Sequence, residues 1–144
     1  MIETNTKALD FTLLDQDKKE VKLSDYKDGT VLLYFYPKDD TPGCTKEACM
    51  ITEVYDDFKK NNIVVLGVSS DSPESHIKFK AKYNLPFTLL SDPDKKVIKM
   101  YEAQGTLGFT KRISYLIKKG IITKTYLKVD PANHALDILK DINN

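Results

Sequence analysis

The sequence lacks the features that would mark a membrane, secreted or nucleic-acid-binding protein. No apolar run approaches the roughly 20 residues that cross a bilayer, and the start, M-I-E-T-N-T-K-A-L-D, lacks the charged-then-apolar pattern of a secretory signal. The 22 basic residues nearly balance the 21 acidic ones, so the net charge is only +1. Such a balance favours neither nucleic acid nor a membrane surface as a partner. We therefore expect a cytoplasmic protein.

Cysteine is scarce as well, since Cys44 and Cys49 are the only two. Two thiols five positions apart close too short a loop to stabilise a fold, which disfavours a structural disulfide. In a reducing compartment such a pair is more often catalytic, redox-sensing or metal-binding. The spacing of the two cysteines and of His76 and His134 matches no zinc pattern, so we expect no metal. Both histidines are expected on the surfaces of helices.

The 144 residues predict one domain, spanning residues 1–144, with no internal repeat or low-complexity segment. Apolar runs predict strands at 11–14, 21–23, 31–36, 63–68, 86–90, 113–117 and 121–127. Helices are expected from about 44 to 60, from 73 to 83 behind the capping Ser72, from 92 to 101, and after 133. The apolar residues expected along the second helix are Ile77, Phe79, Ala81 and Tyr83, with Phe79 less well placed than the others. Strands that alternate with helices early, followed by a late hairpin, indicate an α/β fold with a mixed sheet.

The segment 31–49, V-L-L-Y-F-Y-P-K-D-D-T-P-G-C-T-K-E-A-C, contains the candidate chemistry. Its apolar run predicts a strand buried on both faces, which Pro37 ends because proline cannot donate to a sheet ladder. A helix that begins at about Cys44 would place this thiol where free backbone N–H groups and the helix dipole stabilise a thiolate. Thr41 adds a hydroxyl on the same loop, and Cys49 lies in the second turn. This combination indicates thiol redox chemistry.

Pro37, Thr41 and Cys44 fit the pattern Pro-x3-Thr-x2-Cys, and the sequence therefore resembles the peroxiredoxins. The Cys44-x4-Cys49 spacing resembles the Q-type branch, the bacterioferritin comigratory proteins. The resemblance implies a thioredoxin-like fold, with a central mixed β-sheet flanked by helices and an N-terminal β-hairpin. It also implies a thiol peroxidase that acts on hydrogen peroxide and organic hydroperoxides. No bound cofactor is implied, and the protein is expected to be a monomer or weak dimer.

The same resemblance implies a role for each site residue. Cys44 would be the peroxidatic thiolate and form a sulfenic acid, and Cys49 would condense with it to a Cys44–Cys49 disulfide that thioredoxin or a similar dithiol protein reduces. Thr41 would hydrogen-bond the thiolate and the peroxide, and Pro37 would shield them from solvent. Arg112, the only arginine in the chain, precedes a predicted strand and would stabilise thiolate and peroxide together. Glu47 would be a structural support.

An intact helix would keep Cys44 and Cys49 too far apart to form a disulfide. Five residues along an intact α-helix separate two α-carbons by roughly 8.6 Å and about 140° of rotation, whereas a disulfide needs them within about 7 Å. Oxidation is therefore expected to unwind the helix around residues 44–50.

Other interpretations stay open at this point. Cys44 could be an inert core cysteine, and Cys49 could be a core residue while an external thiol resolves the sulfenic acid. Arg112 could be an ordinary surface cation. The whole protein could instead be a thioredoxin-type oxidoreductase, although that class uses Cys-x-x-Cys, or a redox sensor without turnover. Asp39 and Asp40 could form an acid–base pair, but we expect solvated loop carboxylates.

Overall fold

The computed structural model describes residues 2–143. Strand β4 (Thr30–Phe35), which corresponds to the apolar run in the segment 31–49, lies at the centre of an eight-stranded sheet of order β1-β8-β7-β4-β5-β6-β2-β3. It pairs in parallel with β5 (Ile63–Ser69) and antiparallel with β7 (Ile113–Lys118). The predicted mixed sheet is confirmed.

The other elements follow the predicted order with small shifts in their ends. The remaining strands are β1 (Thr6–Lys7), β2 (Thr12–Asp15), β3 (Glu20–Lys22), β6 (Thr88–Ser91) and β8 (Ile121–Tyr126). The helices are α1 (Pro42–Glu53), α2 (Tyr55–Lys60), α3 (Pro73–Tyr83), α4 (Lys96–Met100) and α5 (His134–Ile142), with 3-10 turns η1 (Leu23–Tyr26) and η2 (Thr106–Gly108). The predicted N-terminal hairpin is formed by β2 and β3.

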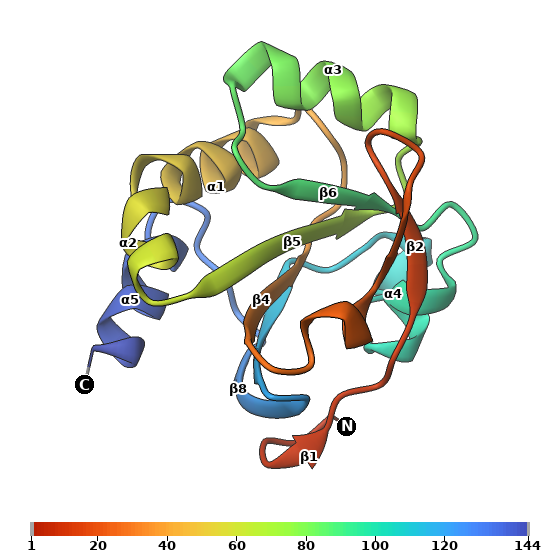
Figure 1. Cartoon of the computed structure of the whole chain (residues 1–144). Coiled ribbons are helices and arrows are strands. Elements are labelled where there is room, and N and C mark those ends of the chain that lie inside the picture. The colour runs from red at the N-terminus through yellow and green to blue at the C-terminus, as the bar shows by residue number, and fades with distance from the viewer. Residues whose placement is uncertain (1, 144) are drawn as a thin grey trace.

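Two hydrophobic cores lie on the two faces of the sheet, because successive β4 side chains point to opposite faces. Val31, Leu33 and Phe35 join one core with residues of α4 and the N-terminal strands. Leu32 and Tyr34 join the other core, which α1, α2, α3 and α5 cover. In Figure 1, α1, α2 and α5 gather on one side of β4 and β5, and α4 lies on the other. The strand is thus buried on both faces, as its sequence predicts.

The first helix differs from its prediction at both ends. It begins at Pro42, with Thr41 as its N-cap, so Cys44 lies within the first turn instead of opening the helix. Proline is well suited to this first position, since it lacks the N–H that would be unpaired there. The helix then breaks at Val54, whose backbone is not helical, and α2 continues to Lys60 as a separate element.

The apolar face of α3 agrees with the predicted one only in part. Ser72 caps the helix as expected, and its Oγ accepts a hydrogen bond from the N–H of Ser75 at 3.1 Å. Phe79 is buried and Tyr83 packs against the core, as predicted. Ile77 is 47% exposed and Ala81 is exposed, and His76 takes the buried position instead. The expectation for Ile77 was wrong because the buried stripe begins with a histidine, which hydropathy alone does not mark as apolar.

Both histidines are buried, which contradicts the expectation of surface positions. His76 is fully buried and its Nε2 lies 3.0 Å from the carbonyl oxygen of Leu90. His134 is 2% exposed, with Nε2 2.8 Å from Ser114 Oγ. Burial and the charge of Arg112 lower the pKa of His134 to about 4, so its ring is neutral near pH 7. Each ring has a hydrogen-bond partner inside the fold, which offsets the cost of burying its polar nitrogens. The periodicity of the sequence does not indicate such partners.

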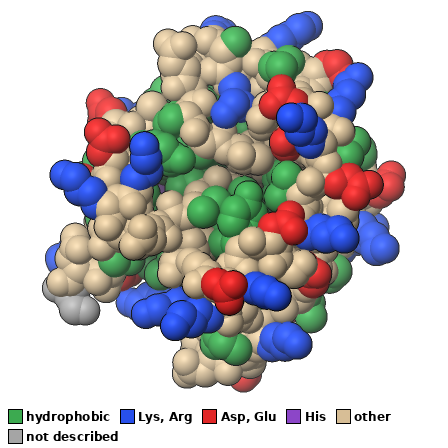
Figure 2. All heavy atoms as spheres, viewed as in Figure 1, with side chains coloured by type: hydrophobic (Ala, Val, Ile, Leu, Met, Phe, Trp, Pro, Cys, Tyr) green, Lys and Arg blue, Asp and Glu red, His purple; other side chains and the backbone are tan. Residues whose placement is uncertain are grey.

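The face of the molecule seen in Figure 2 carries charges of both signs. Figure 2 shows acidic and basic side chains interspersed around the visible face, with hydrophobic side chains near its middle. Among residues 2–143, no helix combines the length and the apolar character needed to cross a membrane.

The buried face of α3 can be tested by unfolding. We expect Phe79→Ala to lower the free energy of unfolding by roughly 3–5 kcal/mol, because it removes a buried ring and leaves a cavity. The matched variant Ile77→Ala on the same helix should change it by less than about 1 kcal/mol, since that side chain is half exposed. Urea denaturation of both variants measures the difference; a larger loss for Ile77→Ala would contradict the burial described here.

Candidate active site

The register of the central strands brings Arg112 to the cysteine. In the antiparallel β4–β7 pair, Phe35 lies opposite Ile113. The residue before β7 and the residues after β4 therefore leave the sheet at the same edge. Arg112 is that residue before β7, and the chain after β4 runs through Pro37 into the first turn of α1. Positions 68 residues apart in sequence meet at this edge.

The guanidinium of Arg112 joins the cysteine to a buried carboxylate. Its Nη2 lies 3.4 Å from Cys44 Sγ, and its Nη1 donates to Glu47 Oε1 at 2.9 Å. Cys44 and Glu47 are three residues apart, which places them on the same face of α1. Both are almost fully buried, at 2% and 1% exposed. One planar fork with several donors can make both contacts at once, which a lysine cannot do.

The charges in this cluster act on one another. Burial raises the pKa of Glu47 to about 7, although the charge and the hydrogen bond of Arg112 oppose the rise. Glu47 Oε2 has no hydrogen-bond partner among the described residues. For Arg112, burial alone would lower the pKa, but the hydrogen bond and charge of Cys44, together with Glu47, raise it overall. The guanidinium therefore stays charged beside the sulfur.

Gly43 leaves room for this arrangement. A β-carbon at this position would lie 2.8 Å from Arg112 Nη2, closer than real contacts allow. Any larger residue would push the guanidinium away from the sulfur. The glycine in T-P-G-C is thus needed for the close approach of Arg112.

Thr41 and Pro37 lie beside the cysteine, but Thr41 does not make the expected contact. Its hydroxyl donates to the carbonyl oxygen of Lys38 at 2.8 Å, and no hydrogen bond to Cys44 is found among residues 2–143. Although Thr41 is the N-cap residue, its side chain makes no capping bond to α1 and instead bonds within its own loop. Both residues, with Thr110, line a hollow of about 510 Å³, whose lining does not include Cys44 or Arg112.

Cys49 lies farther along α1 and is partly buried. Neither it nor Cys44 is part of a disulfide. Burial raises the pKa of Cys49, the charge of Glu53 adds to this, and Lys46 opposes it. The protonated thiol is therefore favoured at this position, and the two cysteines have different surroundings.

Asp39 corrects the expectation of two solvated loop acids. Asp40 is indeed exposed and contacts Lys82 and Tyr83 on α3. Asp39 is only 8% exposed, and its carboxylate is surrounded by hydrogen-bonding side chains, among them that of His76. Sequence reasoning missed this cluster because its members come from separate elements. The two adjacent acids in K-D-D-T look alike in sequence, so nothing there indicates that one of them points inward.

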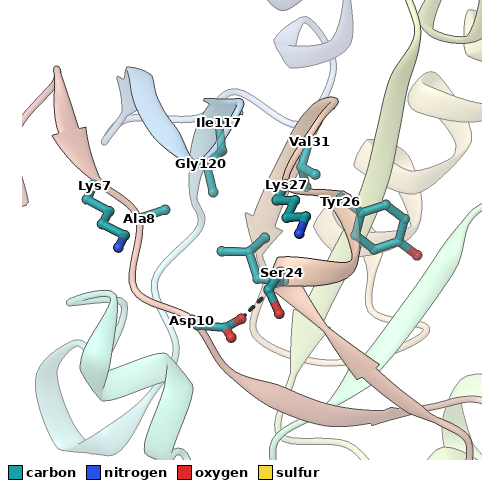
Figure 3. Close-up of a pocket in the computed structure, with 10 residues that line it drawn as sticks. Lys7, Ala8, Asp10, Ser24, Tyr26, Lys27, Val31, Ile117 and Gly120 are labelled. Atoms are coloured by element: carbon teal, nitrogen blue, oxygen red, sulfur yellow. Dashed lines mark hydrogen bonds between the residues drawn. The ribbon is translucent and has the colours of Figure 1, made fainter.

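A second, apolar pocket is separate from this chemistry. It measures about 310 Å³ and lies at the other end of β4 and β7, where Val31 and Ile117 line it. Figure 3 shows Lys7 and Lys27 at this pocket, and the bond between Asp10 and Ser24. Neither cysteine lines it. Its position excludes a direct part in reactions at Cys44.

Comparison with known proteins agrees with this geometry. Residues 4–125 match the model of the AhpC/TSA family. The chain is 40% identical to peroxiredoxin Bcp of Bacillus subtilis, over 99% of this chain and 98% of that protein. It is 46% identical to the chloroplastic peroxiredoxin Q of Triticum aestivum, over 93% of this chain and 64% of that longer protein. A solved structure of the Xanthomonas campestris bacterioferritin comigratory protein, described for its alkyl peroxide reduction activity, superposes with a TM-score of 0.88 at 29% identity, covering 92% of this chain and 90% of the other.

The contact between Arg112 and Cys44 predicts the reactivity of the thiol. We expect Arg112→Gln to slow alkylation of Cys44 by iodoacetamide at neutral pH by roughly ten- to a hundredfold, because a charge-assisted hydrogen bond to the sulfur is lost. The matched control Lys111→Gln removes the same charge from the exposed neighbouring position and should leave the rate nearly unchanged. Mass spectrometry of the alkylated peptide measures both rates. Equal rates in the two variants would show that the contact does not activate the sulfur.

The buried carboxyl predicts a pH dependence of stability. The folded protein holds the Glu47 proton up to about pH 7, whereas the unfolded chain releases it near 4.5. Between these values the folded state binds more protons, so this group's contribution to the free energy of unfolding falls as pH rises and is constant above the window. Denaturant titrations from pH 4.5 to 8 should show a shallower decline in Glu47→Gln than in the wild type. An identical slope would mean that Glu47 titrates at its ordinary pKa.

Proposed function

The chain belongs to the AhpC/TSA family, as a peroxiredoxin, and from that premise we propose that it reduces hydrogen peroxide and organic hydroperoxides at Cys44. The single observation that carries this proposal is the 3.4 Å contact between Arg112 Nη2 and Cys44 Sγ inside a buried cluster. A cation at this distance stabilises a thiolate, and the thiolate is the nucleophilic form of cysteine. The alkyl peroxide activity described for the Xanthomonas relative supports the organic substrates.

In the first step, the Cys44 thiolate attacks the terminal oxygen of the hydroperoxide. The S–O bond forms as the O–O bond breaks, the sulfur is oxidised to sulfenic acid, and the leaving alkoxide or hydroxide takes a proton to become an alcohol or water. Arg112 can stabilise both the thiolate and the developing charge on the peroxide oxygens, since its fork has several donors. Glu47 holds this fork through its 2.9 Å hydrogen bond.

The hollow lined by Pro37 and Thr41 is the proposed route for the substrate. Pro37 would shield one side of the substrate, and the hydroxyl oxygen of Thr41 would accept the hydroperoxide proton. The hydroxyl of Thr41 would exchange its bond to the Lys38 carbonyl for one to the peroxide once substrate is bound. In this scheme Thr41 binds the substrate, and Arg112 stabilises the thiolate.

In the second step, Cys49 resolves the sulfenic acid. Its sulfur attacks Cys44 Sγ, a Cys44–Cys49 disulfide forms, and water leaves. Because α1 is continuous from Pro42 to Glu53, the two α-carbons are held too far apart for this bond until the helix opens. The first turns of α1 must therefore unwind in each cycle.

A dithiol protein such as thioredoxin would complete the cycle. It gives two electrons to the disulfide, which returns to two thiols while the donor becomes a disulfide. No cofactor or metal takes part in this scheme, and a cytoplasmic monomer or weak dimer suffices for it. A thioredoxin-type oxidoreductase or a sensor without turnover would have the same thiols but a different assay profile.

Turnover assays test the scheme. With thioredoxin and its reductase, the wild type should consume peroxide continuously, and Cys44→Ser should lose at least about 10³-fold of the rate because the nucleophile is gone. Cys49→Ser should consume about one equivalent and then stop being recycled by thioredoxin, since no disulfide can form. Peroxide consumption is measured beside reduction of insulin disulfides. Insulin reduction without peroxide turnover would favour the thioredoxin-type oxidoreductase, and unchanged turnover in Cys44→Ser would refute the assignment.

The same proteins report on the helix. After one equivalent of peroxide, amide hydrogen exchange at residues 44–50 should rise in the wild type and stay low in Cys49→Ser, which cannot form the disulfide. Equal protection before and after oxidation would mean that an external thiol resolves the sulfenic acid.

A further inference from the structure

The loop between β4 and α1 is held from inside by one carboxylate. Asp39 lies midway between Pro37 and Thr41, and its Oδ1 accepts a hydrogen bond from the Tyr36 hydroxyl at 2.5 Å. Its Oδ2 accepts from Ser75 Oγ at 2.8 Å, at the start of α3. A carboxylate that accepts two hydroxyl hydrogen bonds is stabilised in its ionised form. Both carboxyl oxygens of Asp39 therefore have hydrogen-bond donors inside the protein.

The ring of His76 supplies the opposite charge. Its Nε2 lies 3.0 Å from the carbonyl oxygen of Leu90, and a carbonyl can only accept, so Nε2 carries a proton. Its Nδ1 lies 2.7 Å from Asp39 Oδ2. Without a proton on Nδ1, two lone pairs would face each other at this distance. If Asp39 is the carboxylate, the two contacts together place protons on both ring nitrogens.

We propose that His76, as an imidazolium, is a positioning residue for peroxide reduction that fixes Asp39 and thereby the loop carrying Pro37 and Thr41 beside Cys44. The inference rests on the proposed function for its kinetic part. Leu90 belongs to β6, so the chain of contacts ties the loop to the rigid sheet as well as to α3. The backbone N–H of Asp39 adds a bond to Asp71 Oδ2 at 2.8 Å.

The neighbouring acid offers a matched comparison. Asp40 also links the loop to α3, through Lys82 Nζ and Tyr83 Oη at 2.7 Å each, but this link is exposed to water. Exposed ion pairs contribute little, whereas removing one partner of a buried pair leaves an uncompensated charge. The backbone of Asp40 is in the left-handed region, with φ +55°, where asparagine is well tolerated. Asp40→Asn thus removes the exposed charge and leaves the backbone unstrained.

The protonation state can be measured without reference to activity. In full-length reduced protein at pH 7, ¹⁵N NMR should show two protonated ring nitrogens for His76. In Asp39→Asn, the ring should become neutral with the proton on Nε2, because a buried cation without a counter-charge is costly, and the amide can donate to Nδ1. A neutral ring in the wild type would overturn the proposal.

The positioning role is tested by two reagents for the same sulfur. In His76→Gln and Asp39→Asn, oxidation of Cys44 by hydrogen peroxide should slow by roughly ten- to a hundredfold, because the groups that orient the peroxide are displaced. Alkylation by iodoacetamide, which needs no such orientation, should change by less than about threefold, as should both rates in Asp40→Asn. Quenched-flow mass spectrometry measures both reactions.

Each outcome is decisive. Equal losses with both reagents would mean that the pair only supports the fold, and unchanged peroxide rates would mean that it does not position the loop; either result overturns the proposal. Asp39→Asn keeps the hydrogen-bonding shape of the side chain, so it serves if His76→Gln fails to fold. If wild-type Cys44 does not react with peroxide at all, the proposed function fails, and with it the positioning role, while the NMR result still decides the charge of the ring.

Discussion

The site depends on a cation that is held, largely out of water, between a sulfur and a carboxylate. Arg112 contacts Cys44 Sγ at 3.4 Å and Glu47 Oε1 at 2.9 Å, and both partners are almost fully buried. Taking such charges out of water is costly unless each finds a partner. The fork of Arg112 meets that requirement, and Gly43 provides the space for it. In the proposed function, this setting prepares the thiol for nucleophilic attack before any substrate arrives.

The sheet makes this contact possible. Because β7 runs antiparallel to β4 in a defined register, its preceding residue meets the segment that follows β4. The two strands have buried side chains on both faces, and a slip in their pairing would expose apolar side chains of both cores. The same packing that stabilises the fold therefore positions the arginine. The contact between Asp39 and His76 connects the loop between β4 and α1, which precedes Cys44, to α3.

Local patterns predicted most of the elements and the central motif. Some features depend only on near neighbours in sequence, so the residues themselves predict them. They are the apolar run in the segment 31–49, the turn residues after it and the cap at Ser72. The burial of His76, His134 and Asp39 could not be predicted in this way, because it depends on partners from other elements. The hydroxyl of Thr41 donates to the Lys38 carbonyl and not to Cys44, a bond within the loop that the motif spacing does not indicate. The periodicity of apolar residues predicts which face of an element is buried. It does not predict a polar side chain that is buried because it forms hydrogen bonds with other elements.

The sequence by itself determined that a cysteine follows a buried strand at the start of a helix, with a second thiol five residues on. These features depend on chain geometry over about twenty residues, where propensity and spacing are sufficient. Only the tertiary structure decided that Arg112 reaches Cys44, that Glu47 holds it there, and that one loop acid is buried against a histidine. Those contacts join residues that lie far apart in sequence or on different elements. Their formation follows from strand register and packing, which no local pattern encodes.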